Sequence, residues 1–518
     1  MVFRVLKISR VVVSIAMLLL VSAVFVDFTG VFSSSFSKSV ALSQLIPELL
    51  SIGKNGLIPM LVTVLILILT LLFGRIYCSS ICPLGVLQDI IGWVTHKVKR
   101  KQRYKSQKNF KMLRYVFLLL SILSFFVSTG YFISFLDPYS NYGRISSMII
   151  KPPIVWLNNM LASIPQKSGT YYFILNEYKF PVISSMIFPI VFLASLLYVV
   201  SKWGRLFCNT LCPVGGLLGL ISKYSIYKIK IDNIACKSCG VCEWKCKAGC
   251  IDKEQKTVDM ERCVMCFNCL DTCPTSVMYF KSGNMKEKQV PEVKANEHRR
   301  DFLKSVSLMG LAAVVPNEKI IKVYKDSLLP VKRNNSVCPP GAVNSTRFHN
   351  ACTACYLCIS KCPNFVLQPS VTEYGLQGFM QPVLNFKYGY CNFECTECLD
   401  ICPTGALKKL DKETKKVTQL GVAKFLKDNC VVYTQGTECG ACSEHCPTKA
   451  VEMVPYKNLL APQVTEEHCI GCGACEYACP TKPYKAIYVE GDPIHGTATK
   501  KKSKVVQPEF KPEEDFPF

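Results

Sequence analysis

The hydrophobic positions of this chain are concentrated in its first 200 residues. Four apolar stretches, at about residues 9–28, 56–74, 113–136 and 180–200, are each long enough to cross the ~30 Å hydrocarbon core of a bilayer as a helix. The loop between the second and third stretch is strongly basic from Lys97 to Arg114, and such loops stay on the cytoplasmic side of a membrane. The pattern therefore predicts a four-helix transmembrane bundle whose N-terminus and C-terminal continuation are cytoplasmic. A cleaved signal peptide is the alternative for the first stretch, but no small-residue cleavage site follows it.

The membrane half also contains an internal repeat. A Gly-Arg-x-x-Cys-x3-Cys-Pro motif begins at Gly74 and recurs at Gly204, each time after an even-numbered apolar stretch. Cysteines four positions apart share a helix face, so two related units could bring four thiolates together around a metal or a cluster. The alternative is a helix-start motif with reducible or merely buried thiols. The candidate cofactor-binding thiols of this repeat are Cys78, Cys82, Cys208 and Cys212.

Cysteine is unusually abundant in the chain, with 30 copies among 518 residues. Two runs after the fourth apolar stretch have the C-x2-C-x2-C-x3-C spacing of bacterial ferredoxins, in which three thiolates hold one [4Fe–4S] cube and the fourth reaches the neighbouring cube. Zinc is the alternative, but zinc sites with four thiolates use two separated C-x2-C pairs. The spacing predicts one cube on Cys236, Cys239, Cys242 and Cys273, and a second on Cys263, Cys266, Cys269 and Cys246. Lys247 stands where a proline is usual, which leaves the nearby Cys250 as an alternative to Cys246.

Four further runs occupy the C-terminal third, and each ends in Cys-Pro. We expect them to hold four more [4Fe–4S] cubes, which brings the predicted total to six. Nested pairing, in which the first run shares cubes with the fourth and the second with the third, is preferred to sequential pairing. The predicted ligands are Cys352, Cys355, Cys358 and Cys362, then Cys391, Cys395, Cys398 and Cys402, then Cys430, Cys439, Cys442 and Cys446, then Cys469, Cys472, Cys475 and Cys479.

The histidines of the chain argue against haem. None of the six lies within an apolar stretch, and no Cys-x-x-Cys-His motif occurs. Membrane b-type haem requires histidine ligands, and c-type haem requires that motif. The sequence therefore predicts no haem, and the expected bound cofactors are iron–sulfur clusters.

A charged linker separates the two cysteine-rich regions. It contains His298-Arg299-Arg300-Asp301-Phe302-Leu303-Lys304, followed by a modestly apolar segment at 305–315. Arg-Arg-x-Phe-Leu-Lys before a short apolar run is typical of a twin-arginine export signal, whereas chance basic residues beside an amphipathic segment are the alternative. Iron–sulfur clusters are inserted in the cytoplasm, and the twin-arginine route exports folded proteins. The signal therefore predicts a weak fifth span and a periplasmic C-terminal domain.

The formal net charge of +24 adds little to this picture. Much of the charge lies beside apolar stretches, where membrane orientation explains it, so nucleic acid is not an expected partner. The expected layout is a membrane domain at 1–230, a cytoplasmic two-cluster ferredoxin at 231–280, a linker at 281–320, a four-cluster domain at 321–485 and a flexible tail at 486–518. The fold class is multidomain, with a four-helix transmembrane bundle, an α+β bacterial-type 2[4Fe–4S] ferredoxin module and a four-cluster ferredoxin-like domain.

These motifs resemble those of two known protein families. Residues 1–280 resemble the NapH-type membrane ferredoxins in their four spans, their two Cys-x3-Cys-Pro motifs and their two cytoplasmic clusters. Residues 298–480 resemble the NapG-type periplasmic ferredoxins in their twin-arginine start, their Pro-Pro-Gly-Ala segment at 339–342 and their four cysteine runs. The chain thus looks like a fusion of the two. The membrane motifs are also similar to those of NosR-type regulators and of a cytochrome-oxidase assembly family, and Cys338 departs from the NapG pattern.

The resemblance implies a quinol dehydrogenase component of a bacterial inner membrane, with the membrane quinone pool and a periplasmic redox enzyme or cytochrome as partners. The clusters carry the electrons, and the protein supplies binding and tuning. Asp137 and Tyr139, at the predicted outer membrane edge, are quinol-site candidates, with interfacial anchoring as the alternative. No catalytic residue is assigned. Two other roles stay open, namely maturation or regulation of a metalloenzyme, and electron entry from a cytoplasmic ferredoxin into quinone.

Overall fold

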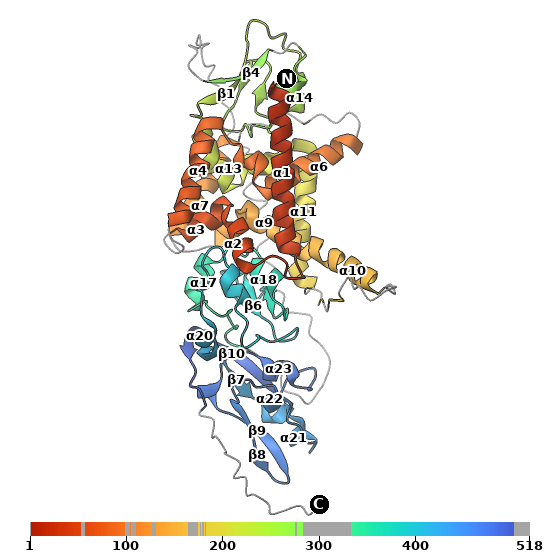
Figure 1. Cartoon of the computed structure of the whole chain (residues 1–518), viewed down its shortest axis with the longest axis vertical. Coiled ribbons are helices and arrows are strands. Elements are labelled where there is room, and N and C mark those ends of the chain that lie inside the picture. The colour runs from red at the N-terminus through yellow and green to blue at the C-terminus, as the bar shows by residue number, and fades with distance from the viewer. Residues whose placement is uncertain are drawn as a thin grey trace, which may run out of the picture.

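A helical body carries a cysteine-rich module at each end, so that the chain forms a column (Figure 1). The computed structural model describes residues 2–52, 57–98, 104, 110–126, 131–163, 175–176, 178, 181, 183–274, 277–282 and 333–501. The predicted twin-arginine segment and fifth span lie outside these residues. The flexible tail predicted at 486–518 begins too early, because Ile487–Thr497 form a strand, β10, that pairs antiparallel with β7 (Thr418–Phe425). Residues 502–518 of that tail lie outside the described residues.

Helices cover all four apolar stretches. They are α1 (Val2–Val26), α4 (Leu57–Phe73), α7 (Lys111–Phe126) and α11 (Ile183–Trp203). Within the described residues, α1 and α11 are long and apolar enough to cross a membrane, and α4 is a shorter apolar helix. The third predicted span is divided, because α7 ends at Phe126 and a separate helix, α8 (Tyr131–Leu136), covers its last part. The predicted fourth span begins a few residues too early.

The outward faces of the long helices are apolar. Leu19 on α1, Leu61 on α4 and Ile187 on α11 are 63%, 66% and 58% exposed. In water such a continuous apolar surface is unfavourable, and it is typical of a surface that contacts a partner or a lipid. Arg10 and Ser14 of α1 and Thr63 and Thr70 of α4 are instead buried, whereas Arg4 and Ser9 near the start of α1 are exposed. This inverted arrangement is what a bilayer environment favours.

Short helices close both ends of the body. At the end that faces the C-terminal domain lie α2 (Ser34–Leu42), α3 (Leu45–Ser51), α9 (Pro138–Ile145), the π-helix η1 (Ser146–Ile150) and α10 (Lys151–Ala162). The two copies of the repeat form α5 (Tyr77–Ser80) with α6 (Pro83–Val98), and α12 (Leu206–Thr210) with α13 (Pro213–Ser222). Asp137 begins α9, since its carboxylate accepts the backbone N–H groups of Tyr139 at 3.2 Å and Ser140 at 3.0 Å.

The first cysteine-rich module is a small α+β unit. Strand β1 (Tyr227–Ile231) pairs antiparallel with β4 (Met278–Ser282), which brings the two ends of the module together. Between them lie α14 (Val241–Lys245), the short pair β2 (Ile251–Asp252) and β3 (Thr257–Val258), and α15 (Asn268–Thr272). Each of the two helices contains the third cysteine of its run and ends immediately before the fourth, so the cysteine spacing sets its length.

The described residues of the C-terminal domain form seven short α-helices and three two-stranded antiparallel pairs, and four of the helices contain the third cysteine of a run. The sheet pairs are β5 (Leu367–Pro369) with β6 (Pro382–Leu384), β7 (Thr418–Phe425) with β10 (Ile487–Thr497), and β8 (Val451–Tyr456) with β9 (Leu459–Val464). The helices are α17 (Ser345–Ala351), α18 (Leu357–Lys361), α19 (Glu397–Ile401), α20 (Lys412–Val417), α21 (Val431–Thr434), α22 (Ala441–Glu444) and α23 (Ala474–Ala478).

Ion pairs attach the two modules to opposite ends of α1. Near its start, Lys7 pairs with Asp271 of the first module at 2.6 Å. Beyond its end, Asp27 pairs with Lys361 of the C-terminal domain. A helix of 25 residues is about 37 Å long at 1.5 Å per residue, so this separation is comparable to the thickness of a bilayer.

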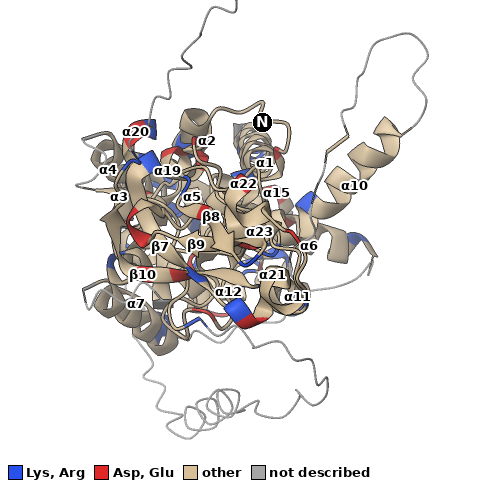
Figure 2. Cartoon of the chain, turned by 90° about the horizontal axis from the view of Figure 1, so that it is seen from below, with Lys and Arg blue, Asp and Glu red and all other residues tan. Residues whose placement is uncertain are grey.

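The surface of the C-terminal domain carries both signs of charge. Figure 2 shows acidic and basic segments side by side around α20, β7 and β10. Lys416 and Lys500 both pair with Glu413, at 3.0 Å and 3.1 Å, and Lys424 pairs with Glu466 at 2.5 Å. Such exposed pairs contribute little to stability, at about 0–1 kcal/mol each, but they leave a mixed, hydrophilic surface.

Candidate iron–sulfur centres

Four cysteine runs share one unusual backbone conformation. In each, the residues immediately before and after the second cysteine have positive φ angles. These pairs are Ser238 and Gly240, Met265 and Phe267, Ala354 and Tyr356, and Gly471 and Gly473. A non-glycine residue in this region costs about 1–3 kcal/mol, so the conformation persists only where the surroundings impose it. Alternating backbone handedness curls a loop so that its N–H groups point inward, which suits an anionic cluster held by thiolates.

The first module brings its thiols together in two groups. Cys236, Cys239, Cys242 and Cys273 all line one small cavity. In the second group, Cys269 lies close enough to Cys263, Cys266 and Cys246 to interact electrostatically with each of them. The two groups match the pairing that the ferredoxin spacing predicts.

Cys250 lies beside the second group without replacing Cys246. Its sulfur is 3.5 Å from that of Cys246, and its N–H donates to the Cys246 sulfur at 3.4 Å. Cys266 and Cys269 both interact with Cys246. The geometry therefore favours Cys246 as the fourth ligand, with Cys250 as a buried thiol next to it.

In the C-terminal domain the first run pairs with the second. Cys358 interacts electrostatically with Cys352, Cys355 and Cys402, which defines the proximal group. The last cysteine of the first run, Cys362, lines a cavity with three thiols of the second run, Cys391, Cys395 and Cys398. Each group thus takes three thiols from one run and one from the other.

The third run pairs with the fourth in the same way. Cys442 interacts with Cys430, Cys439 and Cys479, which defines the distal group. Cys475 interacts with Cys469, Cys472 and Cys446. The nested pairing expected from the sequence is therefore wrong, and the structure has sequential pairing. The reason is local: the β5–β6 pair folds the first run directly back onto the second, and closing a short loop costs less entropy than closing a long one.

The four C-terminal groups form a row that starts at the helical body. The proximal group abuts α9, where Arg144 donates to the Ala354 carbonyl at 3.0 Å and Gly143 packs so closely that a Cβ would clash with the Cys355 carbonyl. In the middle of the row, Cys391 N–H donates to the Cys472 carbonyl at 2.9 Å, which joins the second group to the third. The row therefore leads from the helices to the far end of the domain.

The four thiols of the membrane repeat also converge. Cys212 is buried and interacts electrostatically with Cys208, Cys82 and Cys78. The Cys-Pro step has a structural role, because Cys212 is the N-cap of α13, its sulfur accepts the Gly215 N–H at 3.4 Å, and proline suits the first helical position. This arrangement accommodates both interpretations from the sequence, a buried helix cap and a ligand set.

The arginine of each copy of the repeat donates a hydrogen bond to the other copy. Arg75 of the first copy donates to the Cys208 carbonyl at 3.2 Å, and Arg205 of the second donates to the Cys78 carbonyl at 2.6 Å. Both side chains are buried. The reciprocal contacts give the two repeats a pseudo-twofold relation and explain why the motif contains arginine.

In each copy of the repeat, a further glycine two positions after the Cys-Pro proline, Gly85 or Gly215, is required for this packing. A Cβ at Gly85 or Gly215 would lie well inside contact distance of the Cys78 or Cys208 carbonyl oxygen. We expect Gly85→Ala and Gly215→Ala each to lower the unfolding free energy by about 3 kcal/mol, the upper part of the usual range for overpacking, because a backbone atom cannot move aside as a side chain does. Thermal unfolding in detergent measures the effect.

Gly216→Ala is the matched control for these two variants. It lies in the same helix as Gly215, and a Cβ there would meet side-chain atoms at ordinary contact distance, the nearest being the Leu118 Cβ at 3.4 Å. Equal losses at Gly215 and Gly216 would contradict this interpretation of the motif.

Sequence reasoning missed Asp89, which links the repeat to the first module. Its carboxylate pairs with Arg205 at 2.9 Å, Lys247 at 3.3 Å and Arg10 at 3.4 Å. Burial by itself raises the pKa of Asp89, but these cations outweigh it and lower the pKa to about 2. A single acidic residue in an amphipathic helix carries no spacing signal, so only the fold reveals this role.

Removing the Asp89 charge is expected to loosen the first module. Asp89→Asn leaves Arg10 and Arg205 buried without a counter-charge, which costs about 3–5 kcal/mol. Limited proteolysis within residues 227–282 should become faster, whereas Glu254→Gln, at an exposed position of the same module, should leave it unchanged. Unchanged proteolysis in Asp89→Asn would show that the ion pairs do not hold the module.

The thiol groups suit clusters better than single metal ions. Among the described residues, no group of three or more His, Cys, Asp or Glu side chains is arranged to hold one metal ion. A [4Fe–4S] cube spaces its thiolates more widely, because each thiolate binds a different iron. Groups of four cysteines around small cavities fit this requirement, and bound clusters would supply one-electron chemistry there.

The two quinol-site candidates from the sequence have structural roles. Asp137 is buried as the cap of α9, and Tyr139 packs against Phe25 at 5.7 Å between ring centroids. Asp27, which corresponds to Asp137 at the end of the first span, accepts the backbone N–H groups that follow it. Cys338, the departure from the NapG pattern, is buried beside Tyr374.

Known proteins match several parts of the chain. A 4Fe-4S binding domain model matches residues 55–105 and 185–232, which contain both copies of the repeat, and a 4Fe-4S dicluster domain model matches residues 436–482. No solved structure matches.

Among curated relatives, the methylamine utilization ferredoxin-type protein MauM of Methylophilus methylotrophus is 30% identical over 35% of this chain and 80% of its own length. The ferredoxin-type protein NapH of Haemophilus influenzae is 24% identical over 42% of this chain and 66% of its own length. The putative electron transport protein YccM of Escherichia coli is 28% identical over 42% of this chain, which spans about half of YccM, 54%. The chain belongs to the ferredoxin-type proteins, iron–sulfur electron-transfer proteins with 4Fe-4S domains.

Proposed function

We propose that this chain is a membrane-anchored electron carrier that takes electrons from quinol and passes them to a periplasmic redox enzyme or cytochrome. The row of four C-terminal thiol groups carries the proposal, because it leads from the helical body to the far end of the domain. Together with the two groups of the first module it would hold six [4Fe–4S] clusters. Each cluster would relay one electron at a time, while the protein fixes its position and surroundings.

The positions of the two cysteine-rich modules at opposite ends of the helical body support a bacterial inner-membrane topology. The basic loop predicted to be cytoplasmic leads into α7, and Arg114 near its start pairs with Glu261 of the first module at 3.3 Å. The first module thus lies at the basic end of the body, and the C-terminal domain lies at the other. On this basis we propose that the C-terminal domain is periplasmic, as a counterpart of the NapG-type ferredoxins, and that the twin-arginine segment exports it.

The link between the two sides forms part of the proposal. The modules lie at opposite ends of α1, and the six histidines leave no haem ligand in the apolar helices. The buried thiols Cys78, Cys82, Cys208 and Cys212 lie within the body, in the region matched by the 4Fe-4S binding domain model. A cluster on these thiols would connect the first module with the row, and without it the two modules would serve separate partners.

Reduction by quinol is the test of this function. The purified full chain, mixed anaerobically with a reduced menaquinol analogue, should show bleaching of its cluster absorbance on a turnover timescale. Full bleaching by dithionite in the same sample is the control for intact clusters. Absence of quinol-driven bleaching would overturn the proposal and favour a role in metalloenzyme maturation or regulation. Reduction of quinone by a ferredoxin without the reverse reaction would favour electron entry into the quinone pool.

A further inference from the structure

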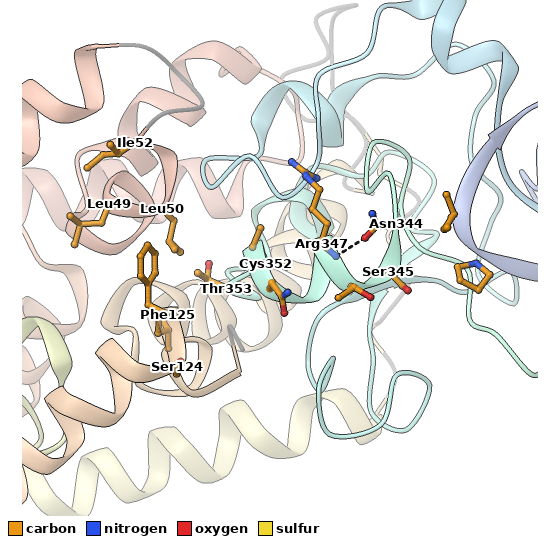
Figure 3. A pocket seen from close by; sticks show the side chains of 16 residues that line it. Leu49, Leu50, Ile52, Ser124, Phe125, Asn344, Ser345, Arg347, Cys352 and Thr353 are labelled. Atoms are coloured by element: carbon orange, nitrogen blue, oxygen red, sulfur yellow. Dashed lines mark hydrogen bonds between the residues drawn. The ribbon is translucent and has the colours of Figure 1, made fainter. Parts of the chain in front are cut away.

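A large cavity lies where the helical body meets the C-terminal domain. It has a volume of about 930 Å³, within the range of small-molecule sites. One side is apolar, with Leu49 and Leu50 near the end of α3 and Phe125 on α7 (Figure 3). The other side is polar, with Asn344 and Arg347 at α17 (Figure 3). The cavity is therefore amphipathic along its length.

A second cavity continues the apolar side into the body. Its volume is about 410 Å³, and Leu49, Leu50, Ile52, Phe125 and Ile133 line both cavities. Its deeper lining is almost wholly apolar and ends at α13, with Leu118 and Leu217 among its residues. Its almost wholly apolar lining fits a hydrocarbon chain.

The polar side reaches the proximal thiol group. Cys352, one of the four thiols of this group, lines the cavity, and so does Thr353. Thr353 is 3% exposed, and its hydroxyl oxygen has no hydrogen-bond partner among the described residues. Its carbonyl is already used by Ser134 at 2.9 Å and Arg144 at 3.2 Å. A buried hydroxyl without a partner is costly, so this one indicates a ligand with a polar head group.

We propose that the joined cavities form the quinol site, with the ring next to Thr353 and Cys352 and the isoprenoid tail along α3 and α7. This inference rests on the proposed function and deepens it by placing the substrate. The Thr353 hydroxyl accepts a hydrogen bond from one quinol hydroxyl. Asp137 and Tyr139 are not part of the site, since neither lines either cavity.

The reaction at this site is the two-electron oxidation of quinol to quinone. Quinol loses two electrons and two protons and becomes quinone. An oxidised cluster held by Cys352, Cys355, Cys358 and Cys402 would be the acceptor of these electrons, one at a time, with the other groups of the row as the onward route. The protons leave to water through the polar side of the cavity. That side of the cavity belongs to the C-terminal domain. The protons are therefore released on the side of the membrane where the C-terminal domain lies.

Two substitutions test the head and the tail of the site separately. Thr353→Val keeps the shape of the side chain and removes the hydroxyl, and we expect the half-saturating concentration of a prenylated menaquinol analogue to rise about five- to tenfold. Leu49→Trp fills the shared part of the two cavities, and we expect reduction by that analogue to slow by at least about tenfold. Menadiol, which has the ring without the tail, should be less affected by Leu49→Trp than the prenylated analogue.

Controls separate this site from the proposed function. Leu65→Trp, at a position of α4 that is 53% exposed and lines neither cavity, should behave as the wild type. Dithionite should bleach all variants fully, which shows that their clusters are intact. Quinol reduction that persists unchanged in Leu49→Trp and Thr353→Val overturns this site alone. A wild-type protein that dithionite reduces and quinol does not overturns the proposed function, and this site with it.

A photoreactive quinone analogue gives a second measurement that does not depend on turnover. The site predicts that its label attaches to α3, α7 or the 344–353 segment of the full chain, and that excess unlabelled analogue prevents the labelling. Attachment confined to other helices, or labelling that Leu49→Trp does not reduce, contradicts the assignment.

Discussion

Replacing both Cys355 and Cys402 with alanine is expected to remove a single [4Fe–4S] cluster, and therefore about 4 iron atoms per chain. The two cysteines belong to different runs, but both interact with Cys358 in the proximal group. Once one ligand is lost, loss of the second from the same cube removes no further iron. Anaerobic iron and sulfide determination on the purified variant measures this result.

A second double variant distinguishes sequential pairing from nested pairing. Cys355→Ala combined with Cys479→Ala should remove two clusters, about 8 iron atoms, since Cys479 belongs to the distal group with Cys430 and Cys442. Nested pairing predicts the opposite order, with two clusters lost in the first double variant and one in the second. That order would contradict the arrangement of the row.

Loss of the proximal cluster also has the largest expected effect on electron transfer. It is the group next to α9 and next to the proposed quinol cavity, so the remaining three clusters of the row lose their connection to the helical body. In Cys402→Ala we expect quinol-driven bleaching of those clusters to fall to background, while dithionite still reduces them. The same substitution in the distal group, Cys430→Ala, should leave the proximal cluster reducible by quinol.

Arg144→Met is expected to uncouple the C-terminal domain from the helices. The guanidinium is 1% exposed and donates to the carbonyls of Ala354 at 3.0 Å, Thr353 at 3.2 Å and Ser134 at 2.8 Å. Across the contact, the Thr353 carbonyl keeps its hydrogen bond from Ser134, whereas the buried Ala354 carbonyl loses its donor, so the contact should weaken by about 1–3 kcal/mol. Methionine keeps most of the volume of the side chain and so limits the effect of a cavity.

Thermal unfolding and quinol reduction measure the two consequences of Arg144→Met. The unfolding transition of the C-terminal domain should separate from that of the helical body and occur at a lower temperature, and quinol should reduce the row more slowly. Lys387→Met is the control, because Lys387 is exposed on the same domain. An Arg144→Met protein with one unchanged transition and an unchanged rate would show that this arginine does not join the two parts.

The sequence was sufficient where chemistry depends on local spacing. A C-x2-C-x2-C-x3-C run defines its own turn, and the structure shows the same left-handed residues around Cys239, Cys266, Cys355 and Cys472. The apolar stretches were located because a helix that contacts lipid must be apolar over its whole length. The repeat could be recognised because both copies of the motif have the same residue types at the same spacing, although the residues that each copy contacts differ.

The sequence was insufficient where distant segments meet. The last cysteine of a run has the same spacing whether its cube lies in the next run or in a later one, so Cys402 gave no sign of its partner. Asp137 has the residue type of a quinol ligand, but its place before Pro138 and Ser140 makes it a helix cap. The cavity at Thr353 combines α3, α7 and the start of the C-terminal domain, which are far apart in the sequence, and Leu49 carries no motif.

The central claim is that the full chain holds six [4Fe–4S] clusters, two in the first module and four in the C-terminal row. The most direct measurement is the iron and acid-labile sulfide content of the full-length protein, purified anaerobically from cells with intact cluster assembly. We expect about 24 of each per chain, and about 28 if the four buried thiols of the repeat hold a further cube. A content of about 16 or less, in protein whose folding is confirmed by a cooperative thermal transition, would contradict it.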